Sequence, residues 1–217
     1  MKLESKGILI GLKPFGERDL IASIFSKDYG VVCGMLKGAL INKKNKALIG
    51  QIGNFSWNAR LDSQLGAFHW EPEKNLVACL MMNMNTLDVV NCVFDLIKAL
   101  LPERENYDAL YDATISLLEK LKTENPFTAY LSWEIELLRD LGYALDLACC
   151  SGCGSRSNLK YISSKTGRAV CETCAKPYLS KVYELPLNLN TTIRFLEKVF
   201  IEQGGKIPMT RKKLSSF

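Results

Sequence analysis

Four cysteines in two pairs are the residues of this chain whose spacing points most directly to chemistry. Cys150 and Cys153 form one Cys-x2-Cys pair, Cys171 and Cys174 form another, and seventeen residues separate the pairs. A structural zinc ion needs four ligands in a tetrahedron, with sulfur at roughly 2.3 Å. Two residues between paired cysteines let the backbone turn so that both sulfurs face one point, and Gly152 eases that turn. The sequence therefore predicts one structural zinc ion held by these four cysteines.

A redox pair and a catalytic metal site are the two other interpretations of the cysteines. A redox Cys-x2-Cys motif normally follows a strand and opens a helix in a βαβ unit, whereas here a hairpin with strands at 159–163 and 168–171 is expected between two matching pairs. A catalytic zinc keeps an open position and usually has a histidine or carboxylate ligand. Cys149 is left out of the set, because using it would lengthen the first pair to three intervening residues. The cluster has few large apolar residues, so metal binding should supply much of its folding free energy, on the order of 10 kcal/mol.

The first 70 residues show the period-two alternation of strands. Short strands are expected at 6–12, 20–26, 31–37, 52–59 and 65–70, with Ile8, Ile10 and Leu12 on one face of the first. Five short strands without helical periodicity predict a small antiparallel barrel, and the OB-fold is the five-stranded barrel that fits. Phe55 and Trp57 face the same way, and their position favours the barrel core over a surface platform.

After Pro72 the apolar residues recur with the period of helices. Apolar stripes run over 87–101, 110–121 and 130–141, and a last helix is expected at 190–204. Asn125 and Pro126 are typical of a helix start, and Gly142 of a helix end. The acidic pair Glu134 and Glu136 is expected to be solvated. The fold class is therefore α+β: an OB-fold domain at 1–76 and a helical domain at 77–217, with the zinc module at about 147–180.

The charge is unevenly distributed. Residues 1–78 have 11 basic and 7 acidic side chains, residues 79–149 have 5 and 12, and residues 150–217 have 12 and 4. Two basic ends around an acidic middle suggest a polyanionic partner, because Lys and Arg gain free energy by displacing counterions from phosphates. A solvated surface of mixed sign explains the same counts.

The sequence contains no recognisable catalytic motif. Phosphate-binding loops, dinucleotide-binding turns and nucleophile elbows are absent, and the one histidine, His69, stands alone on an expected strand. We therefore expect a binding protein and not an enzyme. No apolar run approaches the length of a membrane-spanning helix, and the start has no apolar secretory segment, so a cytoplasmic location is expected.

Several segments resemble the bacterial RecO family of recombination mediators. They are residues 7–20, with Pro-Phe-Gly-Glu-Arg-Asp-Leu at 14–20; residues 25–39, with Lys-Asp-Tyr-Gly at 27–30; residues 137–150, with Leu-Arg-Asp-Leu-Gly-Tyr at 138–143; residues 161–171; and, more weakly, residues 205–211. These segments lie at both ends of the chain and in the same order as in the family.

The resemblance implies a role in DNA repair and recombination. It implies binding to single- and double-stranded DNA, annealing of complementary strands, and loading of RecA onto strands coated by single-strand-binding protein. The implied partners are RecR, the C-terminal tail of single-strand-binding protein and, indirectly, RecA. The implied location is the bacterial cytoplasm, in association with the nucleoid, and no cofactor beyond zinc is implied.

Six basic residues are the candidate DNA contacts, because an OB barrel holds single strands with a basic groove and aromatic platforms. They are Lys13, Arg18, Lys37, Lys43, Lys44 and Lys46. Phe15 is a candidate platform beside them. The family often has adjacent arginines where Leu40 and Ile41 stand here, and a solubilising loop is the alternative role of the lysines. Two rival functions remain: a zinc-ribbon factor of transcription or translation, and a metal-dependent nucleic-acid enzyme.

Overall fold

The structure is a computed structural model that describes residues 1–41, 46–61, 64–143 and 145–215. The chain forms two compact units, Met1–Pro126 and Phe127–Phe217. The five strands of the first unit end at Asn75, close to the change of hydrophobic period. The boundary near residue 76 between a barrel domain and a helical domain stays a prediction.

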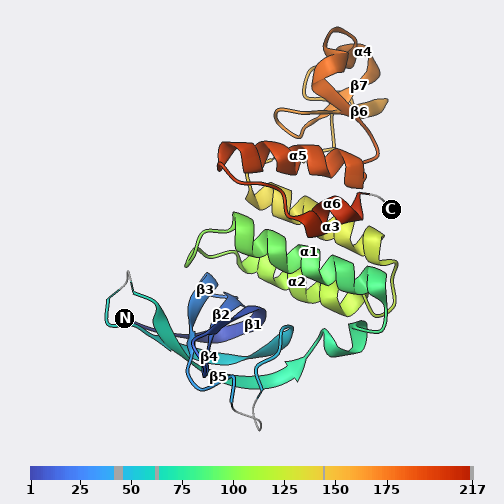
Figure 1. Cartoon of the computed structure of the whole chain (residues 1–217). Coiled ribbons are helices and arrows are strands. Elements are labelled where there is room, and N and C mark those ends of the chain that lie inside the picture. Colours follow the sequence, from blue (N-terminus) through green and yellow to red (C-terminus); the bar gives the residue numbers. More distant parts are fainter. Residues whose placement is uncertain (42–45, 62–63, 144, 216–217) are drawn as a thin grey trace. The chain divides into compact units, whose positions relative to one another are not determined.

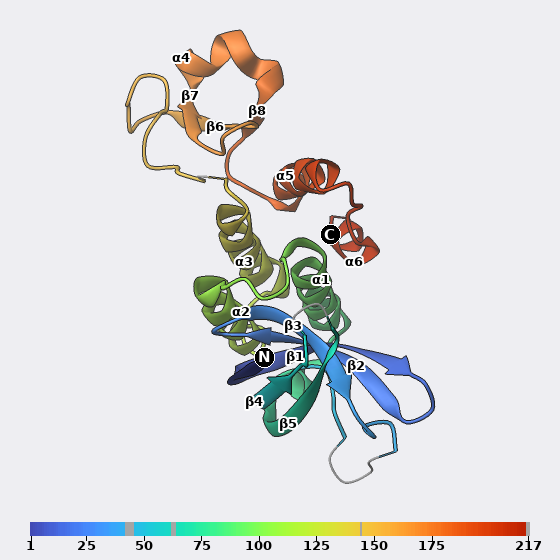
Figure 2. The same cartoon turned by 90° about the vertical axis from the view of Figure 1, so that its left-hand side faces the viewer.

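Five strands close into a barrel in the order β1-β2-β3-β5-β4, shown in blue to teal in Figures 1 and 2. The strands are β1 (Lys2–Phe15), β2 (Asp19–Ser26), β3 (Gly30–Leu36), β4 (Gln51–Asn58) and β5 (Gly66–Asn75). β1 pairs with both β2 and β4, and the parallel pairing of β3 with β5 completes the closure. All five strands expected from the sequence are present, and this strand order confirms the OB-fold.

Aromatic side chains fill the barrel. Phe55, Trp57 and Phe68 belong to its buried core, and the rings of Phe55 and Phe68 meet edge to face with centroids 5.5 Å apart. The indole Nε1 of Trp57 donates to the carbonyl of Cys33 at 2.9 Å. Phe55 and Trp57 are therefore core residues, as their position in the sequence favoured, and they present no surface to a base.

A β-bulge in β1 corrects one expectation from the sequence. The register with β2 shifts between Leu9 and Gly11, so the alternation of the strand is interrupted there. Leu9 lies in the barrel core and Leu12 packs against it, whereas Ile8 and Ile10 are buried but are not part of that core. The prediction that Ile8, Ile10 and Leu12 share one face was wrong for this reason.

Two α-helices and a 3₁₀ turn complete the first unit. They are η1 (Ala78–Leu80), α1 (Met84–Leu100) and α2 (Asp108–Lys120). The side chain of Asn83 caps α1 by accepting from the backbone N–H of Thr86 at 3.3 Å. Tyr111 of α2 contacts Phe25 of β2, with ring centroids 5.6 Å apart. This contact covers part of the outer surface of the barrel with apolar side chains.

Outside the cysteine region, the described part of the second unit has the helices α3 (Pro126–Asp140), which begins at the unit boundary, α5 (Leu189–Glu202) and α6 (Met209–Leu214). Gly142 ends α3 as expected: its φ is +97°, its N–H donates to Arg139, and the N–H of Tyr143 donates to Leu138, which is the Schellman pattern. The sequence did not predict α6.

One carboxylate of α3 is not where the sequence placed it. Glu136 is exposed and pairs with Arg139, but Glu134 is fully buried. The prediction that both glutamates are solvated was therefore wrong for Glu134. Its partner is a buried arginine far along the chain, Arg211.

The cysteine region forms a small three-stranded sheet with short helical turns. Its elements are β6 (Leu159–Ser163), β7 (Ala169–Cys171), α4 (Glu172–Ala175), η2 (Lys176–Lys181) and β8 (Val182–Glu184). β6 is central, and it pairs antiparallel with β7 on one side and β8 on the other (Figure 2). The β6–β7 hairpin confirms the expectation from the sequence, whereas β8 was not expected.

Candidate metal centre and nucleic-acid interface

The first cysteine pair lies in a tight turn before β6. The N–H of Gly154 donates to the carbonyl of Cys150 at 2.9 Å, and the N–H of Cys150 donates to Ser155 at 2.8 Å. A Cβ on Gly152 would lie 3.2 Å from the sulfur of Cys174. Glycine at this position therefore lets the turn approach the second cysteine pair closely.

The hairpin returns the second cysteine pair to the first. Leu159 pairs with Cys171 across the hairpin, and Cys174 follows in α4. The backbone N–H of Cys171 donates to the sulfur of Cys150 at 3.3 Å. The end of β7 is thus bonded to the sulfur of the first cysteine turn as well as to β6 through the ladder.

The four sulfurs form one group. All four ligand atoms lie within 4.8 Å of one another, and the sulfurs of Cys153 and Cys171 are 3.7 Å apart. Cys149 is not part of this group. Four thiols that converge in this way, with backbone N–H groups aimed at the sulfur of Cys150, fit a metal ion that takes four thiolates.

The thiols differ strongly in acidity. Backbone N–H donors, that of Cys171 foremost, lower the pKa of Cys150 to about 6. Hydrogen bonds with the other sulfurs, that of Cys171 foremost, raise the pKa of Cys174 to about 12. Of these two thiols, Cys150 therefore loses its proton more readily.

The module around the cysteines has a small apolar core. Ile162, Ala169 and Ala175 are fully buried, whereas Tyr178 and Leu179 are more than half exposed. Two alanines and one isoleucine bury little apolar surface, so packing contributes little to the stability of this segment. A bound metal ion is the natural source of the remaining stability.

The described candidate DNA contacts gather around one end of the barrel. Lys13 is exposed near the end of β1, Arg18 is exposed in the turn to β2, and Lys37 is exposed directly after β3. The N–H of Leu40 donates to the carbonyl of Arg18 at 3.0 Å, which joins the turn to the segment after β3. Lys46 is also exposed. Lys43 and Lys44 lie outside the described residues.

A row of outward side chains connects these cations. Lys13 pairs with Ile21, and Ile21 pairs with Met35, so the three residues lie side by side on β1, β2 and β3. Ile21 and Met35 are half-buried. Phe15, two residues beyond Lys13 on the same face of β1, is 49% exposed. The surface therefore combines apolar and aromatic groups with flanking positive charge.

Arg60 is an exposed cation that the sequence analysis did not select. It lies in the connection between β4 and β5, and in OB-folds this connection and the one between the first two strands border the oligonucleotide site. A single arginine in a loop forms no pattern in a sequence, and only its position after the fourth strand of a barrel distinguishes it.

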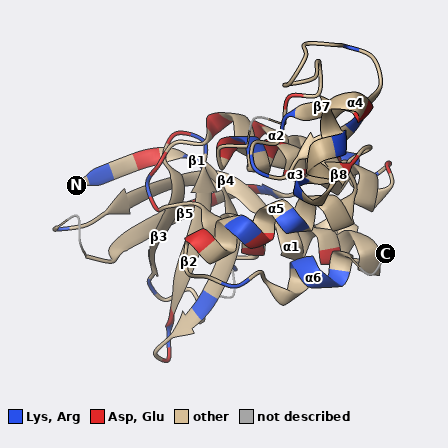
Figure 3. Cartoon of the chain, turned by 90° about the horizontal axis from the view of Figure 1, so that it is seen from above, with Lys and Arg blue, Asp and Glu red and all other residues tan. Residues whose placement is uncertain are grey.

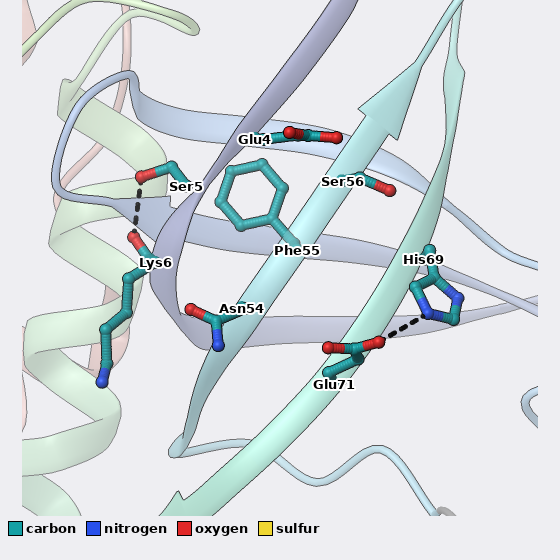
Figure 4. A pocket seen from close by; sticks show the side chains of 8 residues that line it. All are labelled: Glu4, Ser5, Lys6, Asn54, Phe55, Ser56, His69 and Glu71. Carbon is teal, nitrogen blue, oxygen red and sulfur yellow. Dashed lines mark hydrogen bonds and ion pairs between the residues drawn. The ribbon is translucent and has the colours of Figure 1, made fainter.

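A pocket of about 440 Å³ lies over β1, β4 and β5 (Figure 4). It contains the one histidine, His69, whose Nε2 is 3.0 Å from Oε1 of Glu71. Both side chains are about 70% exposed. Its lining also includes the oppositely charged Glu4 and Lys6, so the pocket has no single charge preference.

The barrel and the cysteine module define an α+β protein that combines an OB-fold with a candidate four-thiolate metal centre. The family model "Recombination protein O N terminal" matches residues 1–72, and "Recombination protein O C terminal" matches residues 83–212. The chain therefore belongs to the RecO family.

Curated relatives support the same assignment. DNA repair protein RecO of Ruegeria sp. (strain TM1040) is 35% identical over 188 residues, which is 86% of this chain and 78% of the relative. DNA repair protein RecO of Rickettsia canadensis is 34% identical over 203 residues, 91% of this chain and 83% of the relative. In the part of the chain that is described, no helix is both long and apolar enough to span a bilayer.

Proposed function

We propose that this chain is a noncatalytic mediator of recombinational DNA repair that binds single- and double-stranded DNA. Membership of the RecO family supports the repair role, since the relatives are named DNA repair proteins. The observation that favours DNA binding is the basic end of the barrel, where Lys13, Arg18 and Lys37 are exposed on connected segments. The proposed contact is electrostatic, with the cations displacing counterions from the phosphate backbone.

Phe15 is the proposed stacking platform on this surface. Its ring is half exposed beside the cations, whereas Phe55 and Trp57 are in the core. A base stacked on an aromatic ring contributes roughly 1–3 kcal/mol without sequence preference. This arrangement suits a protein that handles strands of any sequence.

The proposed metal is one Zn²⁺ ion per chain, held by Cys150, Cys153, Cys171 and Cys174. The convergence of four sulfurs supports a structural role, because four thiolates fill the tetrahedron and leave no open position for chemistry. In this proposal the ion fixes the hairpin and the two cysteine turns, and no catalytic step depends on it.

The proposed partners are RecR, the C-terminal tail of single-strand-binding protein and, indirectly, RecA. With RecR the chain would help load RecA onto strands coated by single-strand-binding protein, and alone it would anneal complementary strands. The family assignment supports these partners. A pull-down with RecR and with the tail peptide tests them, and retention of neither would remove them from the proposal.

Strand annealing in the presence of single-strand-binding protein, without ATP or added metal, tests the function as a whole. We expect annealing by the wild-type protein. In the variant Lys13→Gln/Lys37→Gln, oligonucleotide affinity should fall. The slope of log affinity against log salt concentration should become shallower by roughly 1.4, since each lost phosphate contact to a single strand removes about 0.7 from it. Strand cleavage, or no DNA binding even in dilute buffer, would contradict the mediator proposal.

A matched control variant is Lys74→Gln/Lys120→Gln. It removes two exposed lysines from the first unit but away from the basic end of the barrel. We expect its affinity and salt slope to stay close to those of the wild type. Equal losses in both variants would mean that general positive charge, and not the barrel end, attracts the DNA.

A further inference from the structure

Four cations gather where the small sheet meets α5. The N–H of Ser164 donates to the carbonyl of Lys181 at 3.0 Å, and Nζ of Lys198 donates to the carbonyl of Ser164. Lys165 follows Ser164 directly, and Arg194 lies one helical turn before Lys198. We call Lys165, Lys181, Arg194 and Lys198 the second basic cluster.

One aromatic ring holds two members of the second basic cluster. The guanidinium carbon of Arg194 lies 5.2 Å from the centroid of Tyr183, and Nζ of Lys198 lies 5.7 Å from it. Phe195 packs edge to face on the same ring, with centroids 5.3 Å apart. Tyr183 therefore orders both cations in advance, which lowers the entropy lost when they bind an anion.

The carboxylates near the cluster are not in ion pairs with it. Within the described residues, none of its four members forms an ion pair. Glu197 lies between Arg194 and Lys198 in the sequence of α5, Glu184 follows Tyr183 in β8, and Glu202 lines a pocket with Lys165. None of these three carboxylates forms an ion pair with the cluster. Four like charges held together without a counter-ion repel one another, and an anionic ligand would relieve that repulsion.

Two of the cations border a pocket with an exposed aromatic ring. Lys165 and Lys181 line a pocket of about 290 Å³ together with Tyr178, and Tyr178 is 57% exposed. The pairing of basic side chains with an accessible ring is typical of surfaces that bind single strands. Figure 3 shows the basic positions of α5 and α6 in blue, and those of α5 are the cluster members Arg194 and Lys198.

The four-thiolate centre offers a competing explanation for part of this charge. Cys174 lines the same pocket, and a zinc ion with four thiolates has a net charge of about −2. Lys165 and Lys181 therefore offset the metal centre to some extent. Arg194 and Lys198 do not line this pocket, so positive charge extends beyond what the centre requires.

We propose that the second basic cluster, with Tyr178 beside it, is a second binding surface for single-stranded DNA, separate from the barrel. The cations contact successive phosphates, and the ring of Tyr178 stacks on a base. This inference rests on the proposed function, because it requires a protein that binds DNA. It adds a second contact to single-stranded DNA, on the unit that has the metal centre. A protein with two such surfaces can hold two strands, which annealing needs.

The experiment measures binding of an oligothymidylate by fluorescence anisotropy over a range of salt concentrations, with zinc-loaded full-length protein. The variants are Lys165→Gln/Lys181→Gln and Arg194→Gln/Lys198→Gln, made in the wild type and in the barrel variant Lys13→Gln/Lys37→Gln. We expect each double substitution to weaken binding at least about fivefold at low salt and to lower the salt slope by roughly 1.4. The two separate pairs keep the test valid if replacing Arg194 and Lys198 disturbs the packing on Tyr183.

The matched control is Lys206→Gln/Lys212→Gln, which removes two exposed lysines of the same unit outside the cluster. Bound zinc and the circular dichroism spectrum verify that every variant is folded. Ultraviolet crosslinking provides an independent measurement: a peptide containing Tyr178 should crosslink to the strand, and Tyr178→Ala should abolish that crosslink.

The outcomes separate this inference from the proposed function. Wild-type affinity and slope in both cluster variants, with a loss in the barrel variant, would overturn the second surface and leave the barrel contact standing. A loss in the cluster variants alone would support the second surface and remove the barrel contact. An equal loss in the Lys206/Lys212 control would also overturn the inference, because the effect would then belong to the net charge of the unit.

Discussion

The guanidinium of Arg211 in α6 lies against the carboxylate of Glu134 in α3, with Nη2 2.9 Å from Oε2 and a second bond from Nε to Oε1. Both side chains are completely buried. Arg211 also donates to the carbonyl of Leu189 at 2.8 Å, and the hydroxyl of Tyr130 donates to Glu134 at 2.6 Å. The pair therefore fastens α6 to α3 and to the start of α5 within the second unit.

Replacing Arg211 alone should destabilise the protein strongly. The variant Arg211→Met leaves the carboxylate of Glu134 buried without its cation, and breaking a buried pair in this way costs about 3–5 kcal/mol. Urea-induced unfolding followed by circular dichroism measures the loss. A change below about 1 kcal/mol would show that the pair does not hold the helices together.

Two further variants control this experiment. Lys212→Met changes the exposed neighbour of Arg211 in the same helix, and its effect should be within about 0.5 kcal/mol, as for most surface substitutions. Glu134→Gln/Arg211→Met removes both charges, and it should recover part of the stability lost in Arg211→Met.

The features that the sequence predicted depend on residues close together in the chain. Two Cys-x2-Cys pairs define a four-sulfur site because two intervening residues limit where each sulfur can lie, and the four sulfurs do lie within 4.8 Å of one another. The strands of the barrel follow from the period-two alternation of apolar and polar residues. Gly142 marks the end of α3 because the residue at that position has a positive φ, which glycine adopts without steric cost. Local geometry determines each of these features.

The features that the sequence did not predict depend on distant partners or on irregularities. Glu134 has the spacing of the buried stripe of α3, but a carboxylate is expected in water, and only Arg211, 77 residues later, explains its burial. The bulge after Leu9 reverses the facing of the residues around it, and the only residue type that indicates it is Gly11 at the shift. The second basic cluster joins a turn, the end of η2 and the helix α5, which lie too far apart in the sequence to form one local pattern.

Removing the metal should unfold the cysteine module. The variant Cys171→Ser removes one proposed ligand, the thiol whose sulfur lies 3.7 Å from that of Cys153. Metal binding stabilises such modules by on the order of 10 kcal/mol. We expect one zinc per chain in the wild type, a large loss of bound zinc in the variant, and rapid proteolysis within residues 150–181. Metal analysis and limited proteolysis measure both effects.

Cys149→Ser is the matched control for metal binding, because Cys149 lies next to a proposed ligand and outside the four-sulfur group. It should retain the zinc of the wild type. Loss of the ion in Cys149→Ser with retention in Cys171→Ser would require a different ligand set.

Gly66 should not tolerate a side chain. A Cβ at this position would lie 2.2 Å from Cε2 of Trp57 in the barrel core, and overpacking of a well-packed core typically costs 1–3 kcal/mol. Thermal or urea unfolding of Gly66→Ala measures this cost. In the control Gly11→Ala, the nearest atom is Cδ of the flexible Lys98 at 3.2 Å, so a smaller loss is expected. Equal losses of stability in the two variants would contradict the close packing of Trp57 against Gly66 in the barrel core.

The lysines after β3 provide a test of where the DNA passes over the barrel. Replacing Lys43, Lys44 and Lys46 together by Gln should weaken DNA binding and flatten its salt dependence by up to about three counterions, because each phosphate contact releases about one. The variant Lys2→Gln/Lys74→Gln/Lys120→Gln loses the same charge from exposed positions of the first unit, and it should keep a slope close to that of the wild type. If the first variant keeps the wild-type affinity and slope, these lysines serve solubility, and the contact is confined to Lys13, Arg18 and Lys37 at the ends of β1 and β3. In that case the DNA follows the row of Ile21 and Met35 as far as Lys37 and does not contact Lys43, Lys44 or Lys46.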